Sequence, residues 1–161
     1  MNALPSHELG MTILMTPDMA NFAGNVHGGH LLKLLDQVAY ACASRYAGRY
    51  VVTVSVDQVL FRQPIHVGEL VSFLAAVNHT GRSSMEVGIK VVAEDIHTQG
   101  RRHVNSCYFT MVAVDEQGRP TEVPARVPGD ALQTLRFHQA ALRKRSRLEL
   151  HQQLLSTDSA P

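Results

Sequence analysis

Residues 27–48 read HGGHLLKLLDQVAYACASRYAG, and this segment sets the architecture of the whole chain. It opens with a histidine and a glycine pair, contains no proline, and stops at Gly48. Its apolar residues fall on every side of the helix that their spacing predicts. Because a helix that is apolar all round must be covered all round, we expect a central helix wrapped on nearly all sides.

Outside this helix, apolar and polar residues alternate as they do in β-strands. The alternation predicts a short edge strand before the helix and four strands after it, at 11–15, 52–56, 67–79, 85–95 and 103–115. Tight turns that contain glycine separate the later strands, so neighbours are expected to pair antiparallel. One helix and one sheet predict an α+β fold in which a curved antiparallel sheet wraps around the central helix.

The end of the chain has a different pattern. Three prolines between 120 and 128 interrupt the strands, and residues 130–155 then read as a polar helix. We therefore expect a domain at 1–125 and a helical tail at 126–161, with a frayed or disordered end from residue 156.

Composition excludes several classes of protein. The chain has 161 residues, which suits one domain, and its net charge of +1 does not indicate a nucleic-acid-binding protein. No apolar run approaches the roughly 18 residues that cross a membrane. With no export signal in 1–10 and both cysteines, Cys42 and Cys107, in apolar segments, we expect a cytoplasmic protein with buried thiols. The histidines lack the spacing of metal ligands, so neither a metal nor a cofactor is expected.

Asp36 is the most informative residue of the helix. It stands between Leu35 and Gln37, in the most apolar helix of the chain, where an ionised carboxylate is costly unless something pairs with it. A structural role would pair it with Lys33 or Tyr40, about one turn away on either side. The other interpretation is a catalytic carboxylate.

A polar loop, residues 21–29, leads directly into the helix. The free N–H groups of a first helical turn can bind an oxyanion, and the helix dipole strengthens this. Glycine at 28 and 29 allows a ligand carbonyl to approach closely, although a glycine pair can also simply start a helix.

Loop and helix share one motif, Asn21-x-x-Gly24-x-x-x-Gly28-Gly29-x-Leu31-x-x-x-x-Asp36. Further segments of the same pattern lie at 53–57, 61–68, 80–85 and 105–114. These residues resemble the hotdog-fold acyl-CoA thioesterases, in the branch that includes the brain-type acyl-CoA hydrolases and their bacterial single-domain relatives. The resemblance covers about residues 5–114.

The resemblance implies an enzyme that hydrolyses an acyl-CoA to free CoA and a carboxylic acid. Asp36 would activate water or attack directly, with Asn21 as its polar partner. The N–H groups of Gly28 and Gly29 would polarise the thioester carbonyl. Asn25 is a competing loop asparagine whose spacing fits the motif less well.

The spacing of the motif limits how its parts can cooperate. Asp36 follows Gly28 by eight residues, which is about 12 Å along a helix. Catalytic contacts are about 3 Å long, so one carbonyl cannot touch both groups in the same subunit. We therefore predict a homodimer as the minimal unit, with active sites shared between subunits. The resemblance implies that the dimers assemble further, as a trimer of dimers.

The phosphates of CoA need a binding site of their own. The turn at Arg82, Ser83 and Ser84 could hold them through charge and backbone N–H groups, and an ordinary exposed turn is an equal alternative. The basic residues at 143–147 are more typical of a solvated helix end. The candidates for lining the acyl pocket are Phe22, Val59 and Phe61.

Two other functions are alternatives to thioester hydrolysis. A hotdog dehydratase would resemble a histidine and an acid with a proline-rich loop, and here the loop carries asparagine and glycine instead. A non-catalytic acyl-CoA or nucleotide-binding regulator is disfavoured because Asn21 and Asp36 are both present. Some bacterial relatives bind guanine nucleotide, so the resemblance leaves a guanine-nucleotide regulator open.

Overall fold

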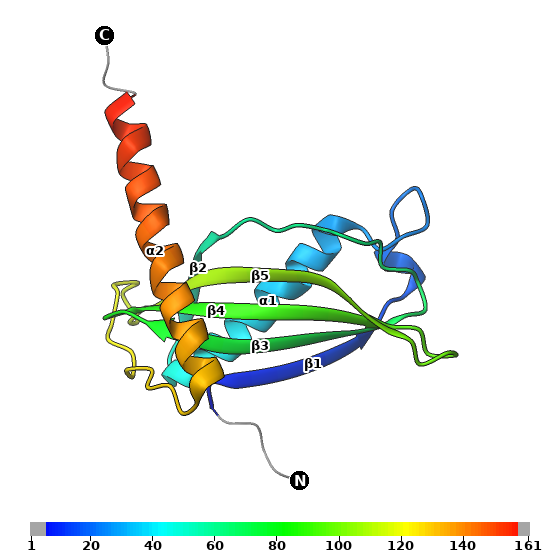
Figure 1. Ribbon diagram of the computed structural model, residues 1–161, viewed down its shortest axis with the longest axis horizontal. Coiled ribbons are helices and arrows are strands. Elements are labelled where there is room, and N and C mark those ends of the chain that lie inside the picture. The colour runs from blue at the N-terminus through cyan, green and yellow to red at the C-terminus, as the bar shows by residue number, and fades with distance from the viewer. Residues whose placement is uncertain (1–5, 158–161) are drawn as a thin grey trace.

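One curved sheet with a helix in its concave side forms the body of the protein (Figure 1). The computed structural model describes residues 6–157. In chain order the elements are β1 (Glu8–Leu14), the 3-10 turn η1 (Pro17–Met19), α1 (Gly28–Ala47), β2 (Val51–Val56), β3 (Leu70–Thr80), β4 (Ser84–Glu94), β5 (Arg101–Ala113) and α2 (Ala131–Thr157).

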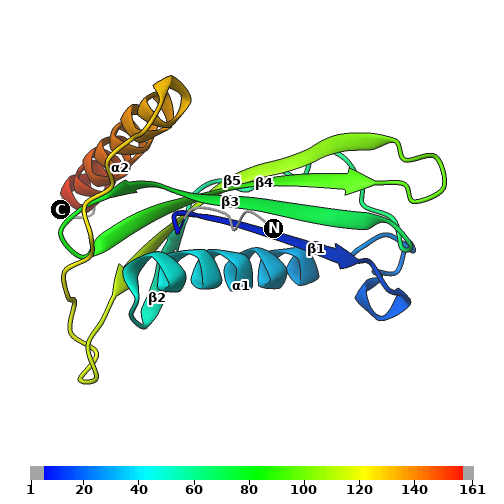
Figure 2. The ribbon, with the colours of Figure 1, turned by 90° about the horizontal axis from the view of Figure 1, so that it is seen from below.

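The five strands form a single antiparallel sheet in the order β1-β3-β4-β5-β2. Figure 2 shows α1 lying along one face of this sheet and α2 crossing the other. This arrangement confirms the predicted hotdog fold. Strands β3, β4 and β5 follow one another through tight turns, whereas the edge strands β1 and β2 pair with partners distant in the chain.

Each predicted strand is shifted by one to three residues at one or both ends in the structure. β3 begins at Leu70 instead of residue 67, because residues 66–69 form a turn in which Gly68 takes a φ of +91°. α2 runs to Thr157, so the helix continues two residues into the predicted frayed end. The rest of that predicted end, residues 158–161, lies outside the described part of the chain.

Local signals at both ends explain where α1 begins and ends. His27 precedes the first turn, and its Nδ1 accepts a 2.9 Å hydrogen bond from the N–H of Gly29. Gly48 ends the helix in the left-handed conformation, with a φ of +62°, which glycine adopts at little cost.

Only one face of α1 is buried, which corrects the prediction of a helix covered on nearly all sides. The residues that pack into the concave side of the sheet are Leu31, Leu34, Leu35, Val38, Ala39, Cys42, Ala43 and Ala47. Leu32 and Tyr40, on the opposite side, are 38% and 42% exposed. The single sheet has one concave face, so within one chain it can cover only one side of the helix.

Both cysteines lie in this core, as predicted. Cys42 and Cys107 are free thiols with no exposed surface. Burial away from water raises the pKa of each thiol to about 12, because the charged thiolate is poorly solvated there. Within residues 6–157, no helix is long and apolar enough to cross a membrane.

The burial of one face of α1 allows us to predict how a substitution there changes the free energy of unfolding. Leu35→Ala should lower the free energy of unfolding by about 2–5 kcal/mol, because Leu35 is fully buried and its removal leaves a cavity. The matched control is Leu142→Ala on α2, where the leucine is 52% exposed and the same atoms are lost. Urea unfolding measures both, and equal losses would contradict the assignment of Leu35 to the core.

Candidate active site

Asp36 lies on the open side of α1, and its side chain is exposed in the single chain. Its carboxylate oxygen Oδ1 accepts a 2.6 Å hydrogen bond from the hydroxyl of Thr53. Among residues 6–157, this hydroxyl is the partner of Asp36, in place of the helix neighbours Lys33 and Tyr40. The predicted burial of Asp36 is therefore wrong for the single chain, where water can reach the carboxylate.

Thr53 reaches Asp36 because it lies two residues after buried Val51, on the same face of β2, which is the face turned toward α1. The pairing of β2 with β5 shifts register between Thr53 and Ser55. A bulge of this kind bends a strand and redirects its side chains, and bulges are common beside functional sites. Thr53 was not predicted as a site residue, because the sequence does not show which residues of α1 face β2.

Asn21 organises the loop before α1. Its side-chain oxygen accepts hydrogen bonds from the backbone N–H groups of Ala23, at 2.9 Å, and Asn25, at 3.1 Å. Gly24 completes the turn with a φ of +79°. Because the oxygen is used within the loop, the amide NH₂ of Asn21 is the part of the side chain that can donate to a ligand.

Asn25, the competing asparagine, faces a different segment. Its Oδ1 lies 2.9 Å from Nδ1 of His66, and the two residues also form an isolated backbone bridge. Asn25 therefore connects the loop before α1 to the loop before β3, which is a structural role.

The first turn of α1 is closely surrounded by two rings. A β-carbon at Gly29 would stand 3.1 Å from the imidazole of His27, and one at Gly28 would stand 3.6 Å from the ring of Phe61. The N–H of Gly29 is held by His27 in this structure. The capping role of His27 was not predicted, because histidine is not among the residues that usually precede the first turn of a helix.

Phe61 belongs to the strap, which we define as residues 57–64. Three hydrogen bonds fasten the strap to β5: Asp57 N–H to Tyr108 O at 2.9 Å, Asn105 Nδ2 to Leu60 O at 2.9 Å, and Arg102 Nη2 to Pro64 O at 2.8 Å. These anchors fix Phe61 beside the start of α1.

A buried ion pair supports the same region. Arg102 donates to both carboxylate oxygens of Glu69, at 2.5 and 2.8 Å, and Glu69 is only 7% exposed. The hydrogen bond from Arg102 holds the pKa of Glu69 below its ordinary value.

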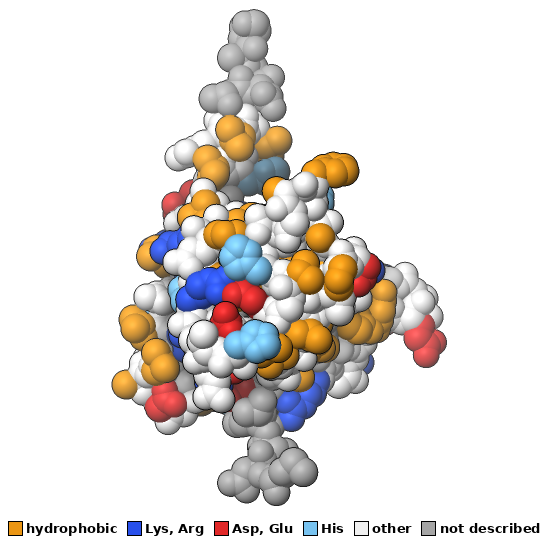
Figure 3. All heavy atoms as spheres, turned by 90° about the vertical axis from the view of Figure 1, so that its right-hand side faces the viewer, with side chains coloured by type: hydrophobic (Ala, Val, Ile, Leu, Met, Phe, Trp, Pro, Cys, Tyr) orange, Lys and Arg blue, Asp and Glu red, His pale blue; other side chains and the backbone are white. Residues whose placement is uncertain are grey.

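The structure separates the predicted site into two parts. Asn21, Gly28 and Gly29 lie together at the start of α1, whereas Asp36 is about 12 Å further along one continuous helix. The end of the molecule that carries the loops also exposes apolar side chains, and Figure 3 faces it. They include Leu14, Phe22, Leu60, Phe61 and Ile96.

The turn predicted to bind CoA connects β3 to β4. Arg82 is exposed and forms a 3.3 Å ion pair with Glu122, the carbonyl of Ser83 accepts from Ala113 N–H, and Ser84 begins β4. Arg82 therefore already has a carboxylate partner, which a phosphate would need to displace.

A second cation lies at this turn. A β-carbon at Gly81 would stand 2.8 Å from Nζ of Lys144 in α2. Across the sheet from this turn, Met85 of β4 pairs with Met111 of β5, and Met111 pairs in turn with Thr53 of β2. It therefore lies two strands away from the contact between Thr53 and Asp36.

The outer edge of β2 exposes apolar and aromatic groups. Val54 and Tyr50 are each 61% exposed, and the rings of Tyr40 and Tyr50 meet edge to face at 6.0 Å. Within residues 6–157, β2 pairs on one side only, with β5. An edge of this kind can join the same edge of a second subunit.

Known proteins share this fold and much of this sequence. Residues 23–99 match the thioesterase superfamily. Protein VdlD of Helicobacter pylori is 51% identical over 140 residues, covering 87% of this chain and 80% of that protein. An apo-hexameric acyl-CoA thioesterase superposes with a TM-score of 0.86 at 34% identity, over 89% of this chain and 92% of that one.

An acyl-CoA hydrolase from Staphylococcus aureus, solved with butyryl-CoA and CoA, superposes with a TM-score of 0.81 at 29% identity. The alignment covers 94% of this chain and 95% of that one. Three further structures of the same hydrolase replace an asparagine, an aspartate and a threonine with alanine.

The pair of Arg102 and Glu69 predicts a pH-dependent contribution to stability. A carboxyl whose pKa is lowered by folding adds stability above its unfolded pKa and loses it as the pH falls through the folded value. Glu69→Gln should therefore cost about 1–3 kcal/mol at pH 7, with the difference from wild type shrinking below pH 4.5.

Glu94→Gln is the control for this measurement, because its partner Arg101 is an exposed surface residue. Thermal unfolding at pH 3 to 8 compares the variants. A loss for Glu69→Gln that stays constant over this range would show that the ion pair is not its source.

Proposed function

The chain belongs to the thioesterase superfamily, and on this premise we propose that it hydrolyses the thioester of an acyl-CoA to free CoA and a carboxylic acid. Relatives named as acyl-CoA thioesterases or hydrolases support the substrate class. The proposed catalytic residues are Asn21, Asp36 and Thr53, together with the N–H groups of Gly28 and Gly29.

One observation carries this assignment. The three positions replaced by alanine in the Staphylococcus hydrolase are separated by 15 and 17 residues. Asn21, Asp36 and Thr53 are separated by the same intervals and have the same residue types. The hydrogen bond between Thr53 and Asp36 gives a physical reason why such a threonine matters.

The geometry around Asp36 suits a general base. Thr53 donates to Oδ1, which orients the carboxylate and leaves Oδ2 to accept a proton from water. The hydroxide then attacks the carbonyl carbon, and the negative charge moves to the carbonyl oxygen. When the C–S bond breaks, protonated Asp36 returns its proton to the departing thiolate. Direct attack by Asp36 is the alternative, in which water hydrolyses an acyl-carboxylate intermediate.

The oxyanion needs donors that Asp36's own subunit does not place beside it. We propose that the start of α1 from a second subunit supplies them, through Gly28 and Gly29, with Asn21 positioning the water. At Gly29 a substrate carbonyl would replace the imidazole of His27, which now accepts that N–H. Strands β2 of two subunits would pair edge to edge to form this dimer.

Assembly and location follow the same relatives. Two similar thioesterases are described as hexameric, which supports a trimer of dimers for this chain. A related mammalian hydrolase is named cytosolic, which supports a cytoplasmic location. We propose the turn at Arg82, Ser83 and Ser84, with Lys144, as the anchor of the CoA phosphates. Regulation by a guanine nucleotide stays a prediction.

Variants of the contact between Thr53 and Asp36 test the reaction. Asp36→Asn should lower thiol release from acyl-CoA by at least ~100-fold, because the base is lost. Thr53→Val should lower it by about 10- to 100-fold through a misoriented carboxylate, while Thr53→Ser keeps the hydroxyl and most activity. Thr12→Val, on the exposed outer strand, is the control. Near-full activity of Asp36→Asn, in a folded and assembled variant, would make Asp36 a structural residue.

Subunit complementation tests the shared site. Asp36→Asn and Asn21→Ala chains, each inactive alone, should recover about a quarter of wild-type activity when co-expressed in equal amounts. Half of the dimers would be mixed, and each mixed dimer would hold one site without a substitution. No recovery, with mixed assemblies shown by mass spectrometry, would place each site within one subunit.

A further inference from the structure

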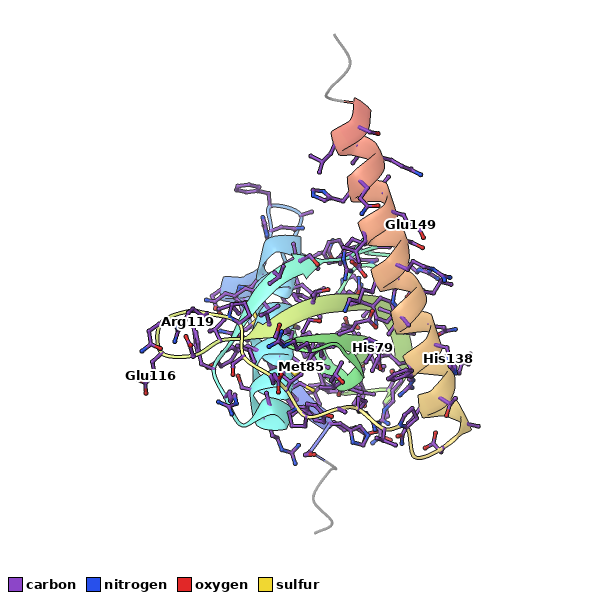
Figure 4. All side chains as sticks on the ribbon, turned by 90° about the vertical axis from the view of Figure 1, so that its left-hand side faces the viewer. His79, Met85, Glu116, Arg119, His138 and Glu149 are labelled. Carbon is purple, nitrogen blue, oxygen red and sulfur yellow. The ribbon has the colours of Figure 1, made fainter. Side chains whose placement is uncertain are left out.

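Helix α2 crosses the convex face of the sheet strand by strand. The ring of Phe137 packs at a tilt of 45° against that of His79 of β3, with ring centres 4.6 Å apart, and Figure 4 shows His79 beside the helix. Two turns later, Arg143 donates to both carboxylate oxygens of Glu86 of β4, at 2.6 and 3.0 Å. Its guanidinium also lies 3.5 Å from the ring centre of Tyr108 in β5.

The last of these contacts is at the edge of the sheet. Arg147 donates a 2.7 Å hydrogen bond to Asp57, the residue that follows β2. The helix then continues past the edge, as Figure 1 shows at its red end. We call residues 148–157 the overhang, which is about 15 Å long at the rise of an α-helix.

The overhang carries leucines on the side that faces the sheet. Leu150 and Leu154 follow Arg147 by three and seven residues, so they lie on the same helix face as Arg147. Each is 56% exposed in the single chain. A short helix end gains little stability by itself in water, so tertiary contacts are expected to hold it.

The free edge of β2 indicates what covers this face. If β2 pairs with the β2 of a second subunit, the partner's strands continue the sheet at about 4.8 Å intervals. An overhang of about 15 Å then spans roughly three strands of the partner. The edge strand β2 itself exposes apolar residues, Val54 at 61% and Val56 at 43%.

We propose that the overhang lies on the convex face of the partner's sheet, with Leu150 and Leu154 directed toward that sheet. The occupant of this helix face is a second copy of the chain, and two-fold symmetry makes the contact occur twice in each dimer. This inference rests on the dimer of the proposed function. It adds that each subunit holds its partner from the outside of the sheet, opposite the active sites.

Photo-crosslinking tests the position of the overhang. A photoreactive phenylalanine analogue replaces Leu150 in the full-length chain, and light and heavy isotope-labelled chains are co-expressed. We expect crosslinked peptides of mixed mass that join the overhang to the partner's β2 or β5. Crosslinks confined to chains of one mass would overturn the proposal, as would crosslinks to co-purified lipid or to another protein in place of the partner.

A charge on the contact face tests its energetic role. Leu150→Asp should raise the dimer dissociation constant at least tenfold, because a leucine that is buried on assembly is replaced by a carboxylate. Leu142→Asp, on the face of α2 turned away from the sheet, should leave it unchanged within twofold. Sedimentation over a dilution series measures both.

Equal dissociation constants for the two variants would overturn the proposal. Neither readout depends on thioester hydrolysis, so a catalytically inactive protein could still confirm the contact. An active protein with no mixed-mass crosslinks would reject the overhang contact and leave the proposed function standing.

Discussion

The burial of one face of α1 in the concave side of the sheet is the interaction on which the rest of the molecule depends. Leu35, Val38 and Cys42 have no exposed surface, so the helix is held straight and in place along its length. A straight helix keeps its first turn about 12 Å from Asp36. Each subunit consequently presents an N-terminal group of donors and a carboxylate that cannot act on the same atom. Two chains related by a two-fold axis, with their α1 helices antiparallel, are the simplest way to bring them together.

Polar contacts stabilise the loops at the start of α1. Glu69 and Arg102 form a buried ion pair, and Asn105 fastens the strap through Leu60. Among the described residues, Oδ1 of Asn105 is buried without a hydrogen-bond partner, which is costly in a folded protein. Buried polar groups fix geometry at some expense of stability, and here they position Phe61 over the helix start.

Periodicity and turns in the sequence were enough to predict the helix, the five strands and the antiparallel sheet. These features depend on neighbouring residues, such as the alternating valines of β2 and the glycine turns. The one-sided exposure of α1 was not predictable, because the composition of a helix does not show how much surface its own chain can cover. The contact between Thr53 and Asp36 was missed for a related reason: it joins a strand to a helix residue 17 positions earlier, and the sequence does not show which helix residues face that strand. The ion pair between Arg102 and Glu69 was not predicted either, because its two residues lie 33 positions apart in the chain.

The buried cysteines bear on the chemistry of the product. An acyl-CoA hydrolase releases CoA, and the disulfide of oxidised CoA is attacked by accessible protein thiolates, which forms a mixed disulfide and releases one CoA thiolate. Burial raises the pKa of Cys42 and Cys107 to about 12, so both thiols stay protonated at neutral pH. Neither has any exposed surface through which an oxidised CoA could reach it. The core that supports α1 therefore also shields both cysteines from disulfide exchange with oxidised CoA.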